Sequence, residues 1–411
     1  MTSIALKKEA SFYRTIILEV LGKMPFGRLQ ITLPDGEIIE IGNGEKNIEA
    51  NILIRDNAFF KKCFLFGDVG FGESYVDGYW ETDNIANVIR WFLLNVEHAP
   101  SMSGSNYKNI FLNIFKFINK LGHFSKANSI NGSKENIHEH YDLSNDFFKL
   151  FLDKSMTYSG AYFKTENHSL EEAQTEKYHR LCQQLKISEN DHVLEIGSGW
   201  GGNAIHIAKN YGCKITTATI SEEQYAYIKE LVERENLSHK ITVLLKDYRL
   251  IEGKFDKIVS IEMLEAVGHT FLDAYFKKCN DLLKKDGMLA LQVITCPDAR
   301  YEQLKKGIDW IQKHIFPGSL LPSVAAINKA VNSSSDMSLV DLKDIGLHYA
   351  ETLSHWRKNF NHHIEEVKKL DFNDAFIRKW NYYFSYCEAA FESRNISVMQ
   401  FIYVRPNNRF Y

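Results

Sequence analysis

The sequence lacks several features that would assign the chain to a special class. Its six cysteines are scattered and none forms a C-x-x-C pair, so we expect no metal site. No run approaches the ~20 apolar residues that a membrane-spanning helix needs. The first residues, MTSIALKKEA, lack the charged start, long apolar core and cleavage site of a signal peptide. These absences predict a soluble, cytoplasmic chain with reduced thiols.

An excess of charge of one sign is also missing. The formal net charge is −3 over 411 residues, which argues against nucleic acid as a partner. The composition is otherwise that of a globular protein, with 45% hydrophobic and 25% charged residues. The length allows two or three domains.

The first 136 residues predict a small α+β domain followed by a linker. In the domain, 1–100, RLQITLPDGEIIEIG indicates a hairpin, and GDVGFGESYVDGYW is expected to be a glycine- and aromatic-rich loop. The linker, 101–136, contains an amphipathic helix at 107–122, with Lys108, Lys116 and Lys120 off the centre of its apolar face. This helix either packs on its own protein or lies in a membrane interface.

The remaining range, 137–411, predicts a doubly wound α/β domain. From about residue 165 strands and helices alternate, which is typical of a mostly parallel sheet covered on both faces. Residues 297–370 look like a largely helical insertion or lid. The segment SVMQFIYVR is expected to add a last strand.

The stretch DHVLEIGSGWGG, residues 191–202, predicts a strand that runs into a glycine-rich turn. It is no phosphate-binding P-loop, because no Lys-Ser/Thr follows, and its glycines are spaced G-x-G-x-G-G. Glu195 precedes the turn, where a carboxylate repels a pyrophosphate and suits the cationic amino acid end of S-adenosylmethionine. Asp247 follows another strand and can accept a hydrogen bond from an adenine amino group. A dehydrogenase would need an acidic residue after the second strand, which ends TTATIS. The pattern therefore favours a methyltransferase.

Five motifs in order then carry a resemblance: HYDLSNDFFKLFLDKSMTYSGAYF, VLEIGSGWGG, TISEEQ, SIEMLEAVGH and LQVIT. Together they resemble the cyclopropane-fatty-acid synthase family, which includes the mycolic acid cyclopropane synthases. The resemblance runs from about residue 135 to the C-terminus, and GFGESYVDGYW is similar to the extra domain of the phospholipid-acting members. It implies a Rossmann-like class I methyltransferase domain with a helical lid. It also implies that the enzyme adds a methylene across a cis double bond of unsaturated phospholipid acyl chains, forming a cyclopropane ring.

The resemblance also implies roles for individual residues around S-adenosylmethionine. Near the methionine end of this cofactor it places Tyr158, Ser159, Gly197 and Gly199, with Glu195 behind them. Near the ribose it places Thr219 and Gln224, and at the adenine it places Asp247 and Tyr248.

In the family a bicarbonate ion accepts the proton that leaves when the ring closes. The resemblance assigns Glu265, Tyr349 and the backbone of Ile294 to this ion, and Tyr141 to the active-site aromatics. Two positions depart from the family pattern. Gly160 stands where a cysteine is frequent and leaves a backbone N–H and space for water, and Gln292 stands where a histidine is frequent. Whether bicarbonate is needed here therefore stays open.

Two other functions remain as alternatives. One is a related methyltransferase that leaves a methyl branch or a methylene group without closing a ring, and the other is a non-catalytic lipid-binding protein with the same fold. The preferred interpretation places the enzyme peripherally on the inner face of the membrane, and a homodimer is an open alternative.

Overall fold

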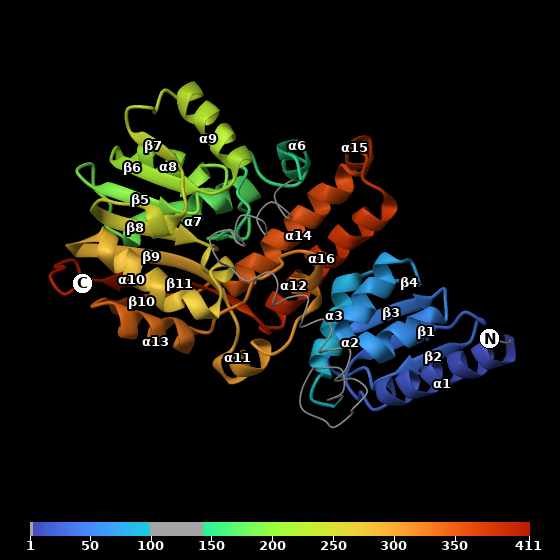
Figure 1. Cartoon of the computed structure of the whole chain (residues 1–411). Coiled ribbons are helices and arrows are strands. Elements are labelled where there is room, and N and C mark those ends of the chain that lie inside the picture. Colours follow the sequence, from blue (N-terminus) through green and yellow to red (C-terminus); the bar gives the residue numbers. More distant parts are fainter. Residues whose placement is uncertain (1–2, 99–142) are drawn as a thin grey trace. The chain divides into compact units, whose positions relative to one another are not determined.

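The computed structural model describes residues 3–98 and 143–411 and divides the chain into two compact units (Figure 1). The first unit comprises Met1–Ser125, Gln303–Pro317 and Ile364–Asn395, and the second comprises the rest. The expected domain ranges were continuous in sequence, whereas the first unit takes in two later segments. The expected linker helix at 107–122 lies outside the described residues.

The first unit combines a small sheet with helices. Its elements are α1 (Ser3–Leu21), β1 (Arg28–Thr32), β2 (Ile38–Ile41), η1 (Glu45–Asn47), β3 (Glu49–Ile54), α2 (Ala58–Val76), β4 (Trp80–Glu81), α3 (Ile85–Leu94), α12 (Trp310–His314), α15 (Ile364–Lys369) and α16 (Asp374–Glu392). The strand order is β2-β1-β3-β4. The predicted hairpin is confirmed, because β1 and β2 pair antiparallel with Leu29 opposite Ile41.

The prediction of a loop in GDVGFGESYVDGYW was wrong. Most of this segment belongs to α2, which breaks only at Gly67, where φ is 58°. The glycines serve close packing: a Cβ at Gly70 would lie 2.1 Å from the carbonyl oxygen of Lys62, and one at Gly72 would lie 2.5 Å from the Trp310 ring. Glycine here permits close approach of neighbouring elements as well as turns, which the sequence pattern alone does not separate.

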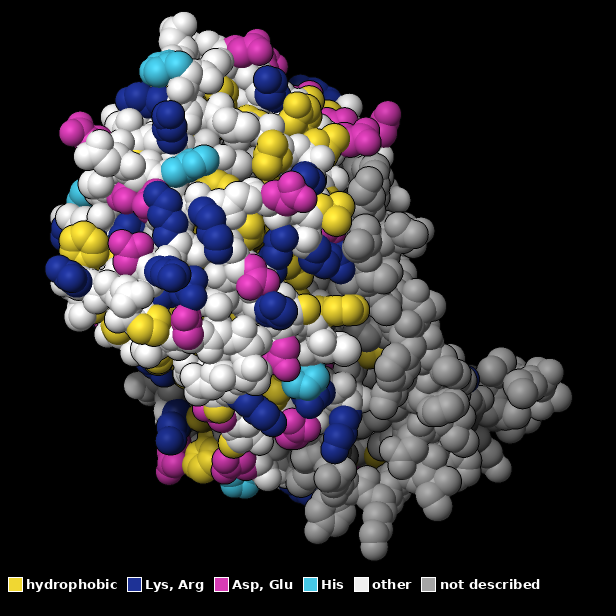
Figure 2. Space-filling view, turned by 60° about the vertical axis from the view of Figure 1, so that its left-hand side comes forward, with side chains coloured by type: hydrophobic (Ala, Val, Ile, Leu, Met, Phe, Trp, Pro, Cys, Tyr) yellow, Lys and Arg dark blue, Asp and Glu magenta, His cyan; other side chains and the backbone are white. Residues whose placement is uncertain are grey.

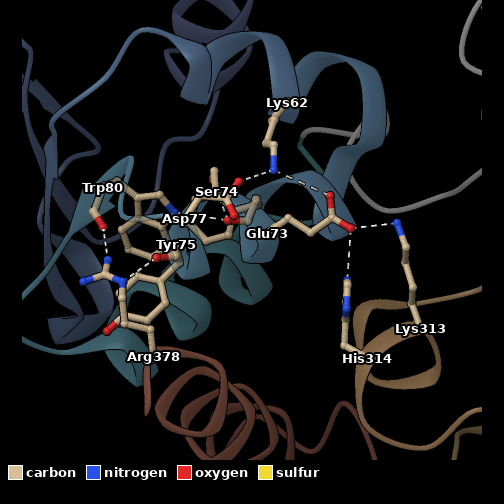
Figure 3. Close-up of polar contacts among 10 residues, drawn as sticks. Lys62, Glu73, Ser74, Tyr75, Asp77, Trp80, Lys313, His314 and Arg378 are labelled. Atoms are coloured by element: carbon tan, nitrogen blue, oxygen red, sulfur yellow. Dashed lines mark hydrogen bonds and ion pairs between the residues drawn. The ribbon is translucent and has the colours of Figure 1, made fainter. Parts of the chain in front are cut away.

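Polar contacts tie the two later segments into the first unit (Figure 3). Glu73 of α2 accepts hydrogen bonds from Lys313 at 2.6 Å and from His314 at 3.0 Å, both on α12. Burial raises the pKa of Glu73, but these two partners outweigh it and the pKa falls to about 2. Arg378 of α16 donates to the carbonyl oxygens of Tyr75 and Trp80.

The second unit contains a seven-stranded sheet with the order β10-β11-β9-β8-β5-β6-β7. The strands are β5 (His192–Ile196), β6 (Lys214–Thr219), β7 (Ile241–Leu245), β8 (Phe255–Ile261), β9 (Leu283–Thr295), β10 (Ser338–Asp344) and β11 (Ser397–Val404). Strands β5 to β9 pair in parallel, and β11 is antiparallel to β9 and β10. The predicted α/β class and the predicted last strand are confirmed.

Helices cover both faces of this sheet (Figure 1). They are α6 (Asn145–Lys149), α7 (Leu170–Gln184), α8 (Gly202–Tyr211), α9 (Glu222–Arg234), η2 (Tyr248–Leu250), η3 (Leu264–Ala266), η4 (His269–Phe271), α10 (Leu272–Leu282), α11 (Asp298–Leu304), α13 (Val324–Ser334) and α14 (Gly346–His362), with α11 running into the first unit. One hydrophobic core lies under α10 and α13, and the other under α7, α8 and α9.

The segment 297–370, expected to be a largely helical lid, proves to be divided. It supplies helices to both units, and it also contains β10, an edge strand of the large sheet. The sequence pattern did not predict β10, because six of its seven residues are exposed and the strand lacks the alternation of buried and exposed residues that identifies most strands.

Candidate active site

The glycine-rich turn joins β5 to α8 and leaves space beside its backbone. Gly197 and Gly199 have φ values of 91° and 50°, and Gly201 caps α8 in the left-handed region. A Cβ at Gly199 would meet no atom within 4 Å. Ser198 Oγ is buried in the same turn without a hydrogen-bond partner among the described residues. An orphaned hydroxyl beside open backbone is suited to a polar ligand.

Glu195 lies at the end of β5, behind this turn, and is buried. Its Oε1 accepts from Asn203 Nδ2 at 2.8 Å and its Oε2 accepts from Thr217 Oγ1 at 2.5 Å. Burial raises the pKa of Glu195 to about 7, against the lowering effect of these two bonds and of Lys177. The carboxylate is therefore held in one orientation, and a nearby cation would favour its ionised form.

The residues expected at the ribose and adenine follow β6 and β7. Thr219 Oγ1 donates to Gln224 Oε1 at 2.8 Å, joining the end of β6 to the first turn of α9. Asp247 accepts from Arg249 on both oxygens, Oδ1 from its Nε and Oδ2 from its Nη2. An adenine amino group would therefore share this carboxylate with a guanidinium. The Tyr248 side chain is partly buried, which raises its pKa to about 12.

Tyr158 and Ser159 lie on the segment that precedes α7. The Tyr158 ring packs on Phe148 and Trp356, with centroids 5.4 and 5.1 Å away. Ser159 Oγ accepts from Nζ of Lys177, a fully buried lysine, at 2.7 Å. Burial lowers the pKa of Lys177 to about 7, although Glu262, Asp153 and Glu195 oppose that change.

The described groups fit S-adenosylmethionine by their chemistry. The turn offers open backbone and an orphaned hydroxyl, and a buried carboxylate lies behind it. Thr219, Gln224, Asp247 and Tyr248 follow the next two strands, at the edge where ligands of this fold bind. These residues would hold the cofactor.

A second cluster centres on Glu262, which directly follows β8. Glu262 Oε1 accepts from the backbone N–H of Gly160 at 2.9 Å and from Gln292 Nε2 at 2.8 Å. Burial raises the pKa of Glu262 above its usual value, and these two hydrogen bonds oppose that change. A hydrogen bond from Tyr349 to the same carboxyl group also lowers the pKa. Three of the residues expected around the proton acceptor therefore converge on one carboxylate.

Glu265 lies one turn further on and has a different environment. Its Oε1 accepts from the backbone N–H of Ile294 at 2.5 Å. Its Oε2 is buried without a hydrogen-bond partner among the described residues. Burial and the negative charge of Glu262 raise the pKa of Glu265 to about 8. Buried oxygens that lack a partner are uncommon, so this atom is a candidate contact for a ligand.

The space that the sequence suggested at Gly160 is filled, so the expected room for water is absent. A Cβ at this position would lie 2.9 Å from Cγ of Tyr349 and 3.4 Å from Oε1 of Glu262. A cysteine would therefore displace the tyrosine ring.

Gln292 is fixed by a chain of side-chain hydrogen bonds. Its Nε2 also donates to the carbonyl oxygen of Gly160, and its Oε1 accepts from Gln400 Nε2 at 2.9 Å. Gln400 Oε1 accepts in turn from Arg180 Nε, which contacts Asp341. The amide therefore presents its N–H₂ group to Glu262.

The predicted site residues form two groups in the second unit, and one lies outside the described residues. One group lies at the ends of β5, β6 and β7 and, with Tyr158 and Ser159, on the segment before α7. The other comprises Gly160 on that segment, Glu265 in η3, Gln292 and Ile294 in β9, and Tyr349 in α14. The residue outside the described ranges is Tyr141. Sequence reasoning missed Glu262 and Lys177. An acidic residue after a parallel strand had singled out Glu195 and Asp247, and the same rule applied to SIEMLE would have found Glu262.

The charged side chains of the described residues on the surface shown in Figure 2 do not form a patch of one sign. Lys and Arg are interspersed with Asp and Glu on the face shown in Figure 2. Within residues 3–98 and 143–411, no helix is long and apolar enough to cross a membrane. The same ranges hold no group of three or more His, Cys, Asp or Glu suited to a metal ion.

Relatives of known name match most of the chain. It is 34% identical over 388 residues to the tuberculostearic acid methyltransferase UfaA1 of Mycobacterium tuberculosis, covering 92% of this chain and 88% of that protein. It is also 34% identical over 361 residues to the cyclopropane-fatty-acyl-phospholipid synthase of Escherichia coli, covering 87% and 88%.

Solved structures and a family profile agree with these matches. The mycolic acid cyclopropane synthase CmaA1 in complex with SAH and CTAB shares 28% identity, with a TM-score of 0.61 over 66% of this chain and 98% of that one. The profile of the mycolic acid cyclopropane synthetases matches residues 128–401. The chain therefore belongs to the mycolic acid cyclopropane synthetase family and is an S-adenosylmethionine-dependent methyltransferase.

Proposed function

We propose that this enzyme methylates the cis double bond of unsaturated acyl chains in membrane phospholipids and closes a cyclopropane ring. The observation that carries the proposal is a pair of carboxylates, half-buried Glu262 directly after β8 and buried Glu265 one turn further on in η3. Gly160, Gln292 and Tyr349 surround Glu262, and Ile294 binds Glu265. Ring closure needs a base, and this is the part of the site that offers one.

Each group of residues has a task in this proposal. S-adenosylmethionine, when bound, supplies a methyl group on a positively charged sulfur. Glu195 and the glycine turn hold its amino acid end, and Ser159 is kept in place by Lys177. The rings of Tyr158, Trp356 and Tyr349 form an aromatic series, with Trp356 5.1 and 5.9 Å from its two neighbours. Aromatic faces attract a cation and exclude water that would capture it.

The phospholipid substrate is supported by similarity over almost the whole chain to the Escherichia coli synthase, whose name states that activity. The mycolic acid enzymes match a shorter part: cyclopropane mycolic acid synthase 1 of Mycobacterium tuberculosis covers 65% of this chain but 95% of its own length. The additional N-terminal region is therefore what this chain shares with the longer relatives. We assign it to docking on the lipid surface, together with Lys108, Lys116 and Lys120, which lie outside the described residues.

A second candidate is methylation that leaves a branch. The tuberculostearic acid methyltransferase matches 92% of the chain, so a branched product is a specific alternative. Gly160 and Gln292 bear on this choice, because they replace a cysteine and a histidine that the cyclopropane synthases frequently carry.

Lipid mass spectrometry separates the two products. The enzyme is incubated with liposomes of a cis-monounsaturated phospholipid and with S-adenosylmethionine whose methyl group is fully deuterated. Ring closure retains two deuterium atoms, because the third leaves as the proton. A methyl branch retains all three when the cation instead loses a proton from a neighbouring chain carbon, which leaves a branched alkene. A methylene group without a ring also retains two, but it keeps a double bond, which carbon NMR of the product detects. We expect two. A product that retains three deuterium atoms would show that the enzyme leaves a methyl branch and does not close a ring. No label in any lipid, with the cofactor bound, would refute both.

A further inference from the structure

We propose that Glu262 is the proton acceptor of this enzyme and takes the place of the bicarbonate ion. The inference rests on the proposed function, since it assigns a base to the ring-closing step. It goes beyond the family resemblance, in which Glu265, Tyr349 and Ile294 hold a separate ion.

The hydrogen-bond donors of the site carry the proposal. The backbone N–H of Gly160 and the amide of Gln292 both point to Glu262 Oε1, at 2.9 and 2.8 Å, and Tyr349 also bonds to this carboxyl group. Tyr349 is one of the residues that the resemblance assigns to the ion, and Gly160 and Gln292 are the two positions that depart from the family pattern. Because the hydrogen-bond donors of these three residues are already directed at the carboxylate of Glu262, the same donors are not available to bind a free bicarbonate ion.

The local backbone is shaped to deliver this carboxylate. Glu262 has a φ of 49°, in the left-handed region that non-glycine residues seldom adopt. Such a strained conformation tends to persist where it positions a functional group. Its backbone N–H donates to the carbonyl oxygen of Gln292 at 2.7 Å, which fixes the turn beside β9.

Gly160 and Gln292 complete the arrangement. Gly160 has no side chain that would occupy the space taken by the Tyr349 ring, and Gln292 donates without carrying a charge. The hydrogen bonds from Gln400 to Gln292 and from Arg180 to Gln400 hold that amide in its donating orientation. The two departures from the family pattern are thus explained by the same carboxylate.

The two glutamates differ in how many donors they receive. Glu262 accepts from three groups, all of which favour its ionised form, and the positive charge of Lys177 acts in the same direction. Glu265 accepts from the backbone N–H of Ile294 on Oε1, and its Oε2 has no hydrogen-bond partner among the described residues. Burial and the charge of Glu262 raise its pKa to about 8. Paired carboxyl groups in such different environments divide the roles of base and acid. The three donors assign the role of base to Glu262, and the unpartnered Oε2 atom assigns the role of acid to Glu265.

The step balances without a further reactant. After methyl transfer one carbon of the former double bond carries the positive charge, and its neighbour carries the new methyl carbon. A C–H bond of that methyl carbon breaks, its electron pair closes the three-membered ring, and the proton passes to the carboxylate of Glu262. The protonated carboxyl group then returns its proton to water, and no external base is consumed.

The test compares substitutions of Glu262 with and without bicarbonate. The full-length wild type, Glu262→Gln and the exposed control Glu233→Gln on α9 are assayed for deuterated cyclopropane product in carbon dioxide-free buffer. We expect wild type and the control to retain full activity without bicarbonate. Glu262→Gln should lose at least about 100-fold in kcat, the usual contribution of a positioned base. Its affinity for S-adenosylhomocysteine should stay within about threefold of wild type.

A second variant tests the position of the carboxylate. Glu262→Gly suits a positive φ and leaves its space open, so we expect low activity that added bicarbonate or formate partly restores. Three results would overturn the proposal: a wild type that depends on added bicarbonate, a Glu262→Gln enzyme within a few-fold of wild type, or a Glu262→Gly enzyme that binds the cofactor but shows no recovery. If wild type labels no lipid under any condition, the proposed function itself fails.

Discussion

At the residue scale, the site is built from acids whose burial opposes ionisation. Burial raises the pKa values of Glu195, to about 7, and of Glu265, to about 8. Lys177 is shifted in the opposite direction, to about 7, because burial also disfavours its charge. Charged groups with displaced pKa values gather at functional sites more often than at structural ones. The positive charge of Lys177 lowers the pKa of both Glu195 and Glu262, so the charge of a bound ligand should affect these three residues together.

Glu265 makes stability depend on pH in a direction that can be measured. Its folded pKa lies above its unfolded value, so the folded state binds more protons between about pH 4.5 and 8. Stability is therefore lost as the pH rises through this window. Replacement of Glu265 by Gln removes this titration, and we expect a smaller loss of stability between pH 5 and pH 8 than in wild type.

Urea unfolding at the two pH values measures the difference. Glu195 and Glu262 titrate in the same sense and remain in both proteins, so some decline persists. Glu233→Gln, an exposed change on α9, should follow wild type. Equal declines in wild type and Glu265→Gln would show that Glu265 is not held protonated in the folded state.

At the element scale, glycines in α2 set how closely this helix approaches its neighbours. Gly72 faces the Trp310 ring of α12 and the Tyr382 ring of α16, and a Cβ there would lie 2.5 and 2.7 Å from them. Both rings are almost fully buried. Neither aromatic group has free space into which it could move, so the helix itself would have to shift.

Replacement of Gly72 by Ala should therefore destabilise the first unit by about 1–3 kcal/mol, the usual cost of overpacking. The loss would appear as a lower thermal midpoint followed by tryptophan fluorescence. Gly307→Ala is the matched control in the same unit, because a Cβ there meets nothing closer than 4.0 Å. A Gly72→Ala protein as stable as this control would mean that the rings have alternative positions.

At the scale of the whole molecule, the first unit is assembled from three stretches of the chain. Its buried Trp310 and Trp380 come from segments far along the sequence, and Arg378 and Glu73 fasten those segments to α2 and β4 (Figure 3). The chain therefore crosses between the two units several times, and the first unit is not a separable N-terminal module.

A shortened chain that begins at residue 126 tests this organisation. It corresponds roughly to the part that the mycolic acid enzymes match, but it would remove α2 and α3 from α12 and α16. We expect it to expose the buried aromatic surface of these helices, to bind a hydrophobic dye and to aggregate at concentrations at which the full chain is monodisperse. A soluble shortened chain with an unchanged thermal midpoint would contradict this expectation.

The sequence by itself determined the features that depend on neighbours along the chain. Alternating strands and helices, the glycine turn after β5 and the acidic strand ends were all visible in local patterns. They led to the α/β class and to Glu195, and the ordered motifs led to Glu265. Such patterns are legible because burial periodicity and turn chemistry act over a few residues.

Only the tertiary structure decided which side chains meet. Glu262 lies 102 residues from Gly160 and 30 from Gln292 in sequence, and nothing local indicates that both donate to it. The attachment of residues 303–317 and 364–395 to the first unit likewise depends on contacts between residues that are far apart in the sequence. Contacts of this kind arise from the packing of whole elements, so they become visible only once the sheet order and the helix positions are known.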